Sequence, residues 1–369
     1  MSARGLIARP SRAVAGGVVR ARTRGWPRHS RLFAVGERTG WSVDEDARHV
    51  EAAARRLGYE VAPSSWGRYA TAQSVFLASH FEALQPRWLE STHWLGTAYL
   101  HGRPGTEGYP EFDRAFEALR AQPGRFSRIQ VTHAEMRDLV LDAGVEPGSV
   151  HVIPIGIDLE HFPLVTPESR AAARARFGLP EDAFVVGSFQ KDGVGWGEGL
   201  EPKLIKGPDV LVAALGLVAD EADGTHVLLT GPARGYVRAG LERHGIPYRH
   251  LFAQDRAELA RAFQALDVYV VASRQEGGPK AVLEALASGV PLVTTEVGQV
   301  PSIVTDGLDG LVVEVDDPAA LAHAVVRIHD DRGLGSALAA AGRPTAEGYA
   351  YERLDPAWDA LLHGFVARP

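Results

Sequence analysis

The stretch SRQEGGPKAVLEALASGVPLV, residues 273–293, shows how the second half of this chain is built. An apolar run, VYVVAS, ends where the stretch begins, and a Gly-Gly turn then leads into a helical segment. Pro279 suits the first turn of that helix, because proline lacks an N–H that the first turn leaves unused. The free backbone amides of such a helix start bind anions. The stretch therefore predicts a strand, a turn and a helix with an anion site at the start of the helix.

The same alternation of strand and helix continues on both sides of this stretch. Short apolar runs bounded by turn residues recur from residue 31 onward, and they are typical of strands buried on both faces of a parallel sheet. The segment IGIDLEHFPLVTPES at 155–169 is rich in turn formers and indicates a domain boundary. We therefore predict an α/β protein of two doubly wound halves, with ligands beyond the carboxyl ends of the strands. The predicted segments are an Arg-rich tail at 1–30, a Rossmann-like domain at 31–160, a second Rossmann-like domain at 161–345 and a C-terminal helix at 346–369.

Composition limits the class of protein. The 369 residues are 45% hydrophobic and 23% charged, which describes a soluble globular chain long enough for two domains. A net charge of −7 argues against a general nucleic-acid binder. The absence of cysteine excludes disulfides and is compatible with a reducing compartment, so we expect a cytoplasmic protein. No apolar window is long enough to span a membrane.

The first 31 residues contain eight arginines and no acidic residue. We interpret them as a mobile tail or a misassigned start. The alternative is a basic surface arm that contacts anionic lipid, which would place the protein peripherally at the inner face of a membrane. The apolar run AVAGGVV is of marginal length for a signal peptide.

Lysine is rare in this chain and is concentrated in one place. Three of the four lysines, Lys191, Lys203 and Lys206, lie within 16 residues, whereas 35 of the 39 basic residues are arginine. A compact ammonium suits a phosphate as a point charge, whereas a guanidinium is a planar fork. The fourth lysine, Lys280, lies in the Gly-Gly stretch, so the two stretches together predict a divided phosphate site. The alternative is an accident of composition.

Two glutamates flank the start of the predicted helix. Glu276 and Glu284 are eight residues apart, about 12 Å if the span were all helical. This spacing does not suit two carboxylates that cleave one bond, but it suits two that hold the ends of an elongated, hydroxyl-rich ligand. The alternative is two solvated surface acids.

These features resemble a known family. The pattern of Glu, seven residues and Glu is followed by ALASGVPLVTTEVG and by DGLDGLVVEVDDPAALAHAV, and VTHAEMRDLVLDAGV precedes VHVIPIGID at the end of the first half. Together they resemble the donor-binding domain of the family-4 retaining glycosyltransferases, over roughly residues 125–345. The resemblance implies the GT-B fold: two Rossmann-like domains face each other across a cleft, and a C-terminal helix crosses back onto the first domain.

The resemblance also implies roles for the Gly-Gly stretch. Glu276 matches the glutamate that contacts the donor sugar, and Glu284 matches the one that holds the ribose hydroxyls. The amides of Gly277 and Gly278 approach the sugar or its diphosphate, and Lys280 lies beside them.

Basic residues of the second domain are expected to bind the diphosphate. Lys206, in KGPDVLVAAL, matches the family's lysine closely. Lys191 is the candidate for a second, earlier cation, although the glycine-rich insertion DGVGWGEGLEP separates the two. Arg234, in GPARG after a strand, approaches the donor or belongs to an ordinary turn.

The first domain departs further from the family. AYLHG resembles the strand that ends in a histidine near the sugar, which points to His101. Gly36 and Gly40, in AVGERTGW, match the family's Gly-Gly loop only loosely. The acids at 44–46, DED, resemble the metal triplet of a different glycosyltransferase fold, but acids also favour a helix N-terminus. We therefore expect no metal, with Asp44 and Asp46 as the alternative.

The sequence thus predicts an enzyme that moves a sugar, with retention, from a nucleotide-diphosphate sugar to an acceptor hydroxyl of a glycan, glycolipid or natural product. No cofactor is expected beyond the donor. The alternatives are an epimerase or phosphorylase of the same fold, or a protein that binds nucleotide sugars without turning them over. A dehydrogenase is disfavoured, because no G-x-G-x-x-G follows a strand.

Overall fold

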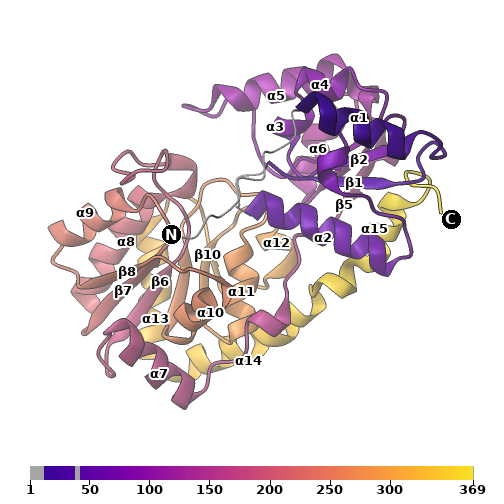
Figure 1. Ribbon diagram of the computed structural model, residues 1–369. Helices are drawn as coiled ribbons and strands as arrows, with labels where there is room; N and C mark the ends of the chain where they lie inside the picture. Colours follow the sequence, from indigo (N-terminus) through magenta and orange to yellow (C-terminus); the bar gives the residue numbers. More distant parts are fainter. Residues whose placement is uncertain (1–11, 38–41, 369) are drawn as a thin grey trace, which may run out of the picture. The chain divides into compact units, whose positions relative to one another are not determined.

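A computed structural model describes residues 12–37 and 42–368 of the chain (Figure 1). It divides into two compact units. Unit 1 comprises Met1–Ile153 together with Asp355–Pro369, and unit 2 comprises Pro154–Leu354. The division falls seven residues before the one expected at 160/161, at the end of the last strand of unit 1 rather than within the turn-rich segment. None of the described helices combines the length and the hydropathy that a membrane span requires.

Unit 1 contains a five-stranded parallel sheet in the order β1-β2-β3-β4-β5. Its strands are β1 (Leu32–Val35), β2 (Ser74–Leu77), β3 (Trp94–Ala98), β4 (Phe126–Val131) and β5 (Val150–Val152). Its α-helices are α1 (Arg12–Thr23), α2 (Ser42–Arg56), α3 (His80–Ala83), α4 (Pro86–Leu89), α5 (Pro110–Ala121), α6 (Ala134–Asp142) and α15 (Asp355–Leu362).

The first strand explains why this sheet counts as doubly wound. All four residues of β1 are buried, as its continuous apolar run predicts for a strand covered on both faces. Leu32 bridges Val61 at one edge, and β2 pairs along the other edge. After β1 the chain first reaches Val61 on one side of the strand and then β2 on the other side. A reversal of this kind creates a ligand crevice at the carboxyl ends of strands.

The N-terminal segment is not a tail from residue 12 onward, which corrects the expectation for residues 1–30. Residues Arg12–Thr23 form α1, in which Val19 is buried. Aromatic side chains fix the segment that follows, because Trp26 stacks on both Phe33 and Trp66 with ring centroids 6.4 and 6.2 Å away. The arginine-rich composition concealed this packing. Residues 1–11 lie outside the described part of the chain.

Unit 2 contains a six-stranded parallel sheet in the order β11-β10-β9-β6-β7-β8. Its strands are β6 (Phe184–Ser188), β7 (Thr225–Thr230), β8 (Tyr248–Leu251), β9 (Val268–Val271), β10 (Leu292–Thr295) and β11 (Leu311–Val313). Its α-helices are α7 (Pro167–Phe177), α8 (Pro208–Glu221), α9 (Gly235–Arg243), α10 (Arg256–Gln264), α11 (Lys280–Ser288), α12 (Val300–Ile303), α13 (Pro318–Asp330) and α14 (Arg332–Gly348).

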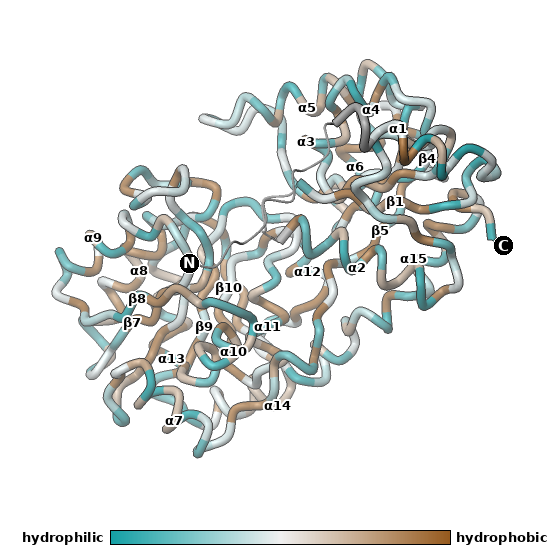
Figure 2. The backbone as a smooth tube through the Cα atoms, in the orientation of Figure 1, coloured by the Kyte–Doolittle hydropathy of each residue, from teal (hydrophilic) through white to brown (hydrophobic). Residues whose placement is uncertain are grey.

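Helices cover both faces of this second sheet. Val185 and Tyr269 pack with α7, α10 and α11, whereas the next residues along the same strands, Val186 and Val270, pack with α8, α9 and α13. Alternate strand residues point to opposite faces, so two apolar layers require strands that are apolar throughout. Figure 2 shows this pattern as brown tube along the central strands. The order of strands reverses between β6 and β9, which predicts a ligand crevice beside them.

The C-terminal residues belong to unit 1. The segment expected as one helix at 346–369 is divided, because α14 ends at Gly348 and α15 begins only at Asp355. Arg128 of β4 fixes the segment by donating to the carbonyls of Leu361 and His363, both at 2.8 Å. Phe365 is fully buried, so this segment completes the core of unit 1.

Candidate functional site

An ion pair links the two lysine- and glycine-rich stretches of unit 2. Lys206 ends a short 3₁₀ turn after β6, and its Nζ lies 2.6 Å from Oε2 of Glu276 in the loop after β9. The side chains are 22% and 9% exposed, so the pair is largely shielded yet open to one side. The structure therefore brings together two residues that sequence reasoning assigned to one site from 70 positions apart.

Two further side chains complete this pair, and sequence reasoning missed both. Ser273 donates to Oε1 of Glu276 at 2.9 Å and lies 3.2 Å from Oε1 of Gln190. Gln190 in turn donates to the backbone carbonyl of Lys206 at 3.0 Å. The only signal for Ser273 was its place three residues before Glu276 at a strand end. Together these bonds fix the carboxylate of Glu276 and the backbone that carries Lys206.

Glycine at position 207 allows the two loops to meet. Gly207 has φ of 61°, in the left-handed region, and a side chain there would run into the backbone of Ala272. The amides of Arg274 and Gln275 both donate to the carbonyl of Ile205, at 2.9 and 3.0 Å. The helix α8 starts directly afterwards, so its first-turn amides lie beside the Lys206–Glu276 pair.

The second glutamate lies deeper in the same unit. Glu284 belongs to α11 and is 6% exposed, so the alternative of a solvated surface acid is wrong for this residue. Burial raises the pKa of the buried Tyr269, the charges of Glu284 and Glu276 raise it further, and the amide of Phe189 and the charge of Arg234 oppose this. Gly277 and Gly278 precede Pro279, the N-cap of α11, and Lys280 is its first residue. Pro279 makes no side-chain capping bond to the amides of the first turn.

Lys191 follows Gln190, whose side chain donates to the backbone carbonyl of Lys206 at 3.0 Å, so the two lysines lie on adjoining loop segments. The Nζ of Lys191 donates to the carbonyl of Gly193 at 3.1 Å. Partial burial lowers the pKa of Lys191, and the positive charge of Lys206 lowers it further. Lys191 and Lys206 are therefore the candidate cations for an anion in unit 2, with Glu276 paired to Lys206.

Arg234 is buried among structural contacts, which corrects its expected approach to a donor. Its side chain is fully buried and donates to the carbonyls of Ser188 and Thr230, at 2.6 and 3.0 Å. The guanidinium also pairs with Asp192, 3.0 Å away and equally buried. Burial raises the pKa of Asp192 although the charge of Arg234 opposes this. The residue therefore ties β6 to β7 instead of facing a ligand.

The unit 1 candidates lie near the carboxyl ends of its strands. His101 follows β3 by three residues, and its ring lies 5.8 and 6.1 Å from those of Phe112 and Phe81. His80, which sequence reasoning missed, lies 6.0 Å from His101 and is buried, and burial holds its pKa well below the ordinary value. His80 is therefore a neutral imidazole beside His101.

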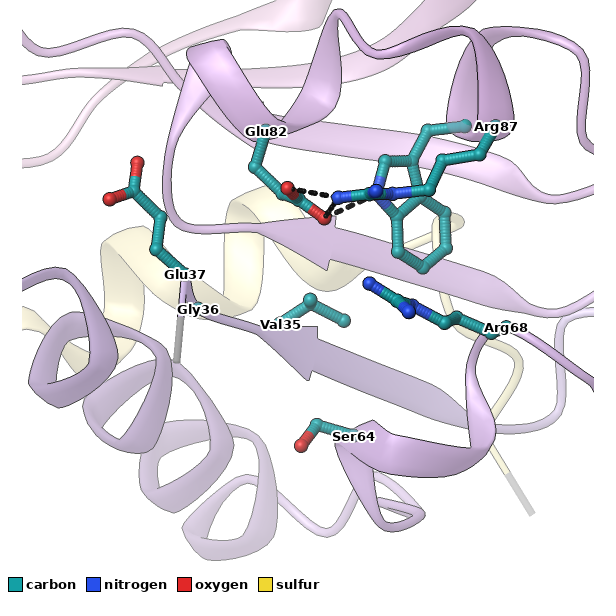
Figure 3. A pocket seen from close by; sticks show the side chains of 8 residues that line it. Val35, Gly36, Glu37, Ser64, Arg68, Glu82 and Arg87 are labelled. Carbon is teal, nitrogen blue, oxygen red and sulfur yellow. Dashed lines mark hydrogen bonds and ion pairs between the residues drawn. The ribbon is translucent and has the colours of Figure 1, made fainter. Parts of the chain in front are cut away.

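A cavity of about 50 Å³ opens at the end of β1 (Figure 3). Gly36 lines it, whereas Gly40 lies outside the described residues. In its lining, the carboxylate of Glu82 accepts hydrogen bonds from Arg87 at 2.6 Å and from the indole of Trp88 at 2.8 Å. In Figure 3 the guanidinium of Arg68 extends toward the same space. The lining of the cavity thus contains two guanidinium groups, of Arg68 and Arg87, and two carboxylates, of Glu37 and Glu82.

No group of three His, Asp or Glu side chains within residues 12–37 and 42–368 is arranged to hold a metal ion. Asp44 lies in the first turn of α2, and Asp46 follows in the same helix. Acids in a first turn are favoured by the helix dipole.

Unit 2 thus holds the cations of Lys191 and Lys206 and the largely buried carboxylates of Glu276 and Glu284 in the segments after β6 and β9. The fold matches solved GT-B glycosyltransferases. The Anabaena protein HepE in complex with UDP has a TM-score of 0.71 at 14% identity and covers 91% of this chain and 100% of its own. The sucrose-phosphate synthase of Thermosynechococcus elongatus has a TM-score of 0.64 at 22% identity, over 87% and 78% of the two chains. The fold is therefore that of the GT-B glycosyltransferases.

Sequence comparison gives the family. Residues 198–331 match the family model described as glycosyl transferases group 1. The D-inositol 3-phosphate glycosyltransferase 1 of Catenulispora acidiphila is 31% identical over 303 residues, which cover 76% of this chain and 68% of that protein. The chain belongs to this family of glycosyltransferases, which are enzymes. Against the similarly named protein of Xylanimonas cellulosilytica, 32% identical, the match spans about half of the relative's length, 53%.

Proposed function

We propose that this protein transfers a hexose from a nucleotide-diphosphate sugar to an acceptor hydroxyl with retention of anomeric configuration. The observation that carries the proposal is the Lys206–Glu276 pair between the starts of α8 and α11. As the glycosidic bond breaks, negative charge grows on the leaving diphosphate, and preorganised cations and amides stabilise that charge most in the transition state. UDP and UDP-glucose, bound by solved neighbours of the same fold, are the donors to test first.

Each carboxylate has its own part in this proposal. Glu276, held by Ser273 and Lys206, contacts the sugar, and Glu284 holds the ribose hydroxyls. His101 is proposed to contact the sugar from unit 1. Carboxylates accept hydrogen bonds only, which suits the hydroxyl groups of both rings.

The acceptor is proposed to bind unit 1. The cavity at the end of β1 offers the guanidinium groups of Arg68 and Arg87, which suit an acceptor that carries a phosphate or carboxylate. Inositol 3-phosphate, named for the relatives, is therefore the first acceptor to assay, followed by sugars and polyols without charge.

The test combines turnover and affinity. With a donor and an acceptor, the wild type is expected to release nucleoside diphosphate only when the acceptor is present, and NMR of the product should show the donor's anomeric configuration. Glu276→Gln should remove most turnover with little change in nucleoside-diphosphate affinity, whereas Glu284→Gln should weaken binding of nucleotide and donor alike. Turnover should persist in excess EDTA within a factor of a few, because lysines and amides neutralise the diphosphate.

Other outcomes identify the alternatives. Conversion of the donor to an isomer without acceptor would indicate an epimerase, and a requirement for inorganic phosphate would indicate a phosphorylase. Tight donor binding without turnover over a broad acceptor panel would indicate a non-catalytic binding protein. Wild-type turnover by Glu276→Gln would remove the proposed sugar contact.

Peripheral membrane contact is proposed for α1 and the turn after it. Arg20, Arg22, Arg24 and Arg28 are exposed there, and residues 12–36 contain no acidic side chain. Basic residues near an anionic surface each contribute about 1 kcal/mol. Sedimentation with phosphatidylglycerol vesicles, but not with phosphatidylcholine vesicles, is the expected result. Equal recovery from both kinds of vesicle would exclude the electrostatic contact.

A further inference from the structure

The glycine-rich loop 192–202 is held in place by backbone hydrogen bonds. At its base, the backbone amide of Val194 donates to the carbonyl of Glu201 at 2.9 Å. The backbone amide of Lys203 donates to the carbonyl of Asp192 at 2.8 Å. Along its far side, the amides of Gly235 and Tyr236 donate to the carbonyls of Glu198 and Gly199, at 2.7 and 2.9 Å. The buried pair of Asp192 and Arg234 anchors its first residue in the core. The loop therefore holds its side chains in fixed places against the first turn of α9.

The loop presents an aromatic ring to one lysine of the proposed diphosphate site. Trp196 is 61% exposed, and the Nζ of Lys191 lies 4.8 Å from the centroid of its ring. An ammonium within about 6 Å of an indole face is attracted by the negative face of the ring. Four of the large apolar side chains exposed in the described part of the chain belong to residues 194–204.

The two lysines need an element that keeps them together. Like charges on Lys191 and Lys206 repel each other. Partial burial lowers the pKa of Lys191, the charge of Asp192 opposes this, and the charge of Lys206 lowers it further. A lysine has four rotatable side-chain bonds, so without a restraint its ammonium would move away into solvent. The ring of Trp196 and the carbonyl of Gly193 supply that restraint.

We propose that Trp196 is a positioning residue, which holds the ammonium of Lys191 beside Lys206 so that both cations bind one diphosphate. An ammonium has three N–H donors, and only one is directed to Gly193. The others remain available for phosphate oxygens while the ring stays in place. Ordering Lys191 before the ligand arrives removes part of the entropy cost of binding. This inference rests on the proposed function, because it assumes that the ligand is a nucleoside diphosphate.

The test is a double-mutant cycle read by calorimetric titration with UDP. Trp196→Leu keeps an apolar side chain but removes the aromatic face, and Lys191→Met keeps the stem but removes the charge. With Lys191 present, Trp196→Leu should raise the dissociation constant of UDP three- to tenfold. With methionine at position 191, the same change should alter it less than twofold, because contacting groups are coupled and independent ones add. Trp196→Phe should restore most of the affinity.

Controls separate positioning from loop structure. Leu200 is 63% exposed in the same loop, and Leu200→Ala should change UDP affinity less than twofold. Uridine, which carries no phosphate, should bind all variants alike. If Trp196→Leu weakened UDP binding equally with lysine and with methionine at position 191, the inference would be overturned, since the ring would then contact the ligand or support the loop. No loss in either background would overturn it too.

Failure of the proposed function gives a different result. If the wild type binds none of UDP, ADP and GDP, both the function and this inference are wrong. If it binds one of them and the cycle shows no coupling between Trp196 and Lys191, only the inference is wrong.

Discussion

Arginine and lysine have different roles in this chain. Arg125 donates to four backbone carbonyls between residues 88 and 93, and Arg343 donates to the carbonyls of Phe162 and Ala287. A guanidinium has five donors in a fixed plane, which suits several carbonyls at once. Lys206, in contrast, makes a single ion pair in a shielded site. The structure thus uses arginine guanidinium groups to hold loops together and the ammonium of Lys206 where one anion is expected.

This difference predicts that Lys206→Arg is not conservative. A guanidinium keeps the charge but needs more room beside Glu276 and a planar partner. Turnover should fall about tenfold or more, which corresponds to about 1.4 kcal/mol in the barrier. Lys206→Ala should lower it further.

Lys203 provides the matched control for this prediction. It lies three residues earlier and is half-buried at the start of the same 3₁₀ turn. Lys203→Arg should leave the steady-state rate nearly unchanged with the same donor. If the two arginine variants both behave like the wild type, the concentration of lysine in this stretch reflects composition alone.

Residue identity alone could not separate the binding residues from the structural ones. Glu276 and Glu284 were predicted from their spacing and the family resemblance, and Lys206 from the resemblance and the rarity of lysine. The structure pairs Lys206 with Glu276 and places Glu284 within α11 of the same unit. Arg234 was expected near the donor because it follows a strand, yet it is buried. Ser273 and Gln190 meet across 83 residues, and only the pairing of β6 with β9 brings them together. A contact that depends on sheet order leaves no local pattern in the sequence.

At the scale of the element, the 192–202 loop depends on its glycines. Gly199 has φ of 72° and lies against the backbone of Ala233, so an added side chain would meet both strain and collision. Gly197, in the same loop, has open space around it and an ordinary φ. The two positions therefore differ in what a methyl group would encounter, although the sequence GWGEG presents them alike.

Gly199→Ala should detach the loop from α9. The left-handed backbone alone costs an alanine about 1 to 2 kcal/mol. In hydrogen exchange, the amides of Gly235 and Tyr236, which donate to the loop, should lose protection. Gly197→Ala should leave them as in the wild type. Unchanged protection in Gly199→Ala would mean that these two bonds do not hold the loop.

Strands and helices were the most predictable level. Apolar runs such as FVVGS and VYVV became buried strands because helices cover both faces of the second sheet. The helix α1 was missed, since its neighbours Tyr69 and Trp66 lie outside it and its own composition is basic. The break between α14 and α15 was missed as well, because the turn there is set by the transfer of the chain from unit 2 to unit 1.

At the scale of the whole molecule, unit 1 depends on residues from both ends of its sequence. Phe365 is fully buried and Ser74 of β2 donates to its carbonyl, while Arg56 of α2 pairs with Asp355 at 2.6 Å. Phe365→Ala should destabilise unit 1 by about 3 to 5 kcal/mol, the usual range for a buried phenylalanine. Phe252, 60% exposed in unit 2, is the control, and its replacement by alanine should change stability by no more than about 0.5 kcal/mol.

Tryptophan fluorescence can follow this prediction, because six of the seven tryptophans belong to unit 1 and only Trp196 to unit 2. In denaturant, the fluorescence midpoint should fall in Phe365→Ala. Titration with nucleoside diphosphate, whose proposed site is in unit 2, should remain as in the wild type under native conditions. An unchanged midpoint would show that the C-terminal segment adds little to the core.

The return of residues 355–368 to unit 1 also has a consequence for synthesis on the ribosome. All residues of unit 2 are contiguous, so that unit can fold as soon as residue 354 has left the exit tunnel. Unit 1 is begun first but lacks Phe365, Leu361 and Leu362 until more than 200 further residues have been translated. At about 5 to 20 residues per second, its nascent sheet waits at least ten seconds with an uncovered apolar surface. Nascent unit 1 is therefore the part of this chain that we expect trigger factor-like chaperones to bind.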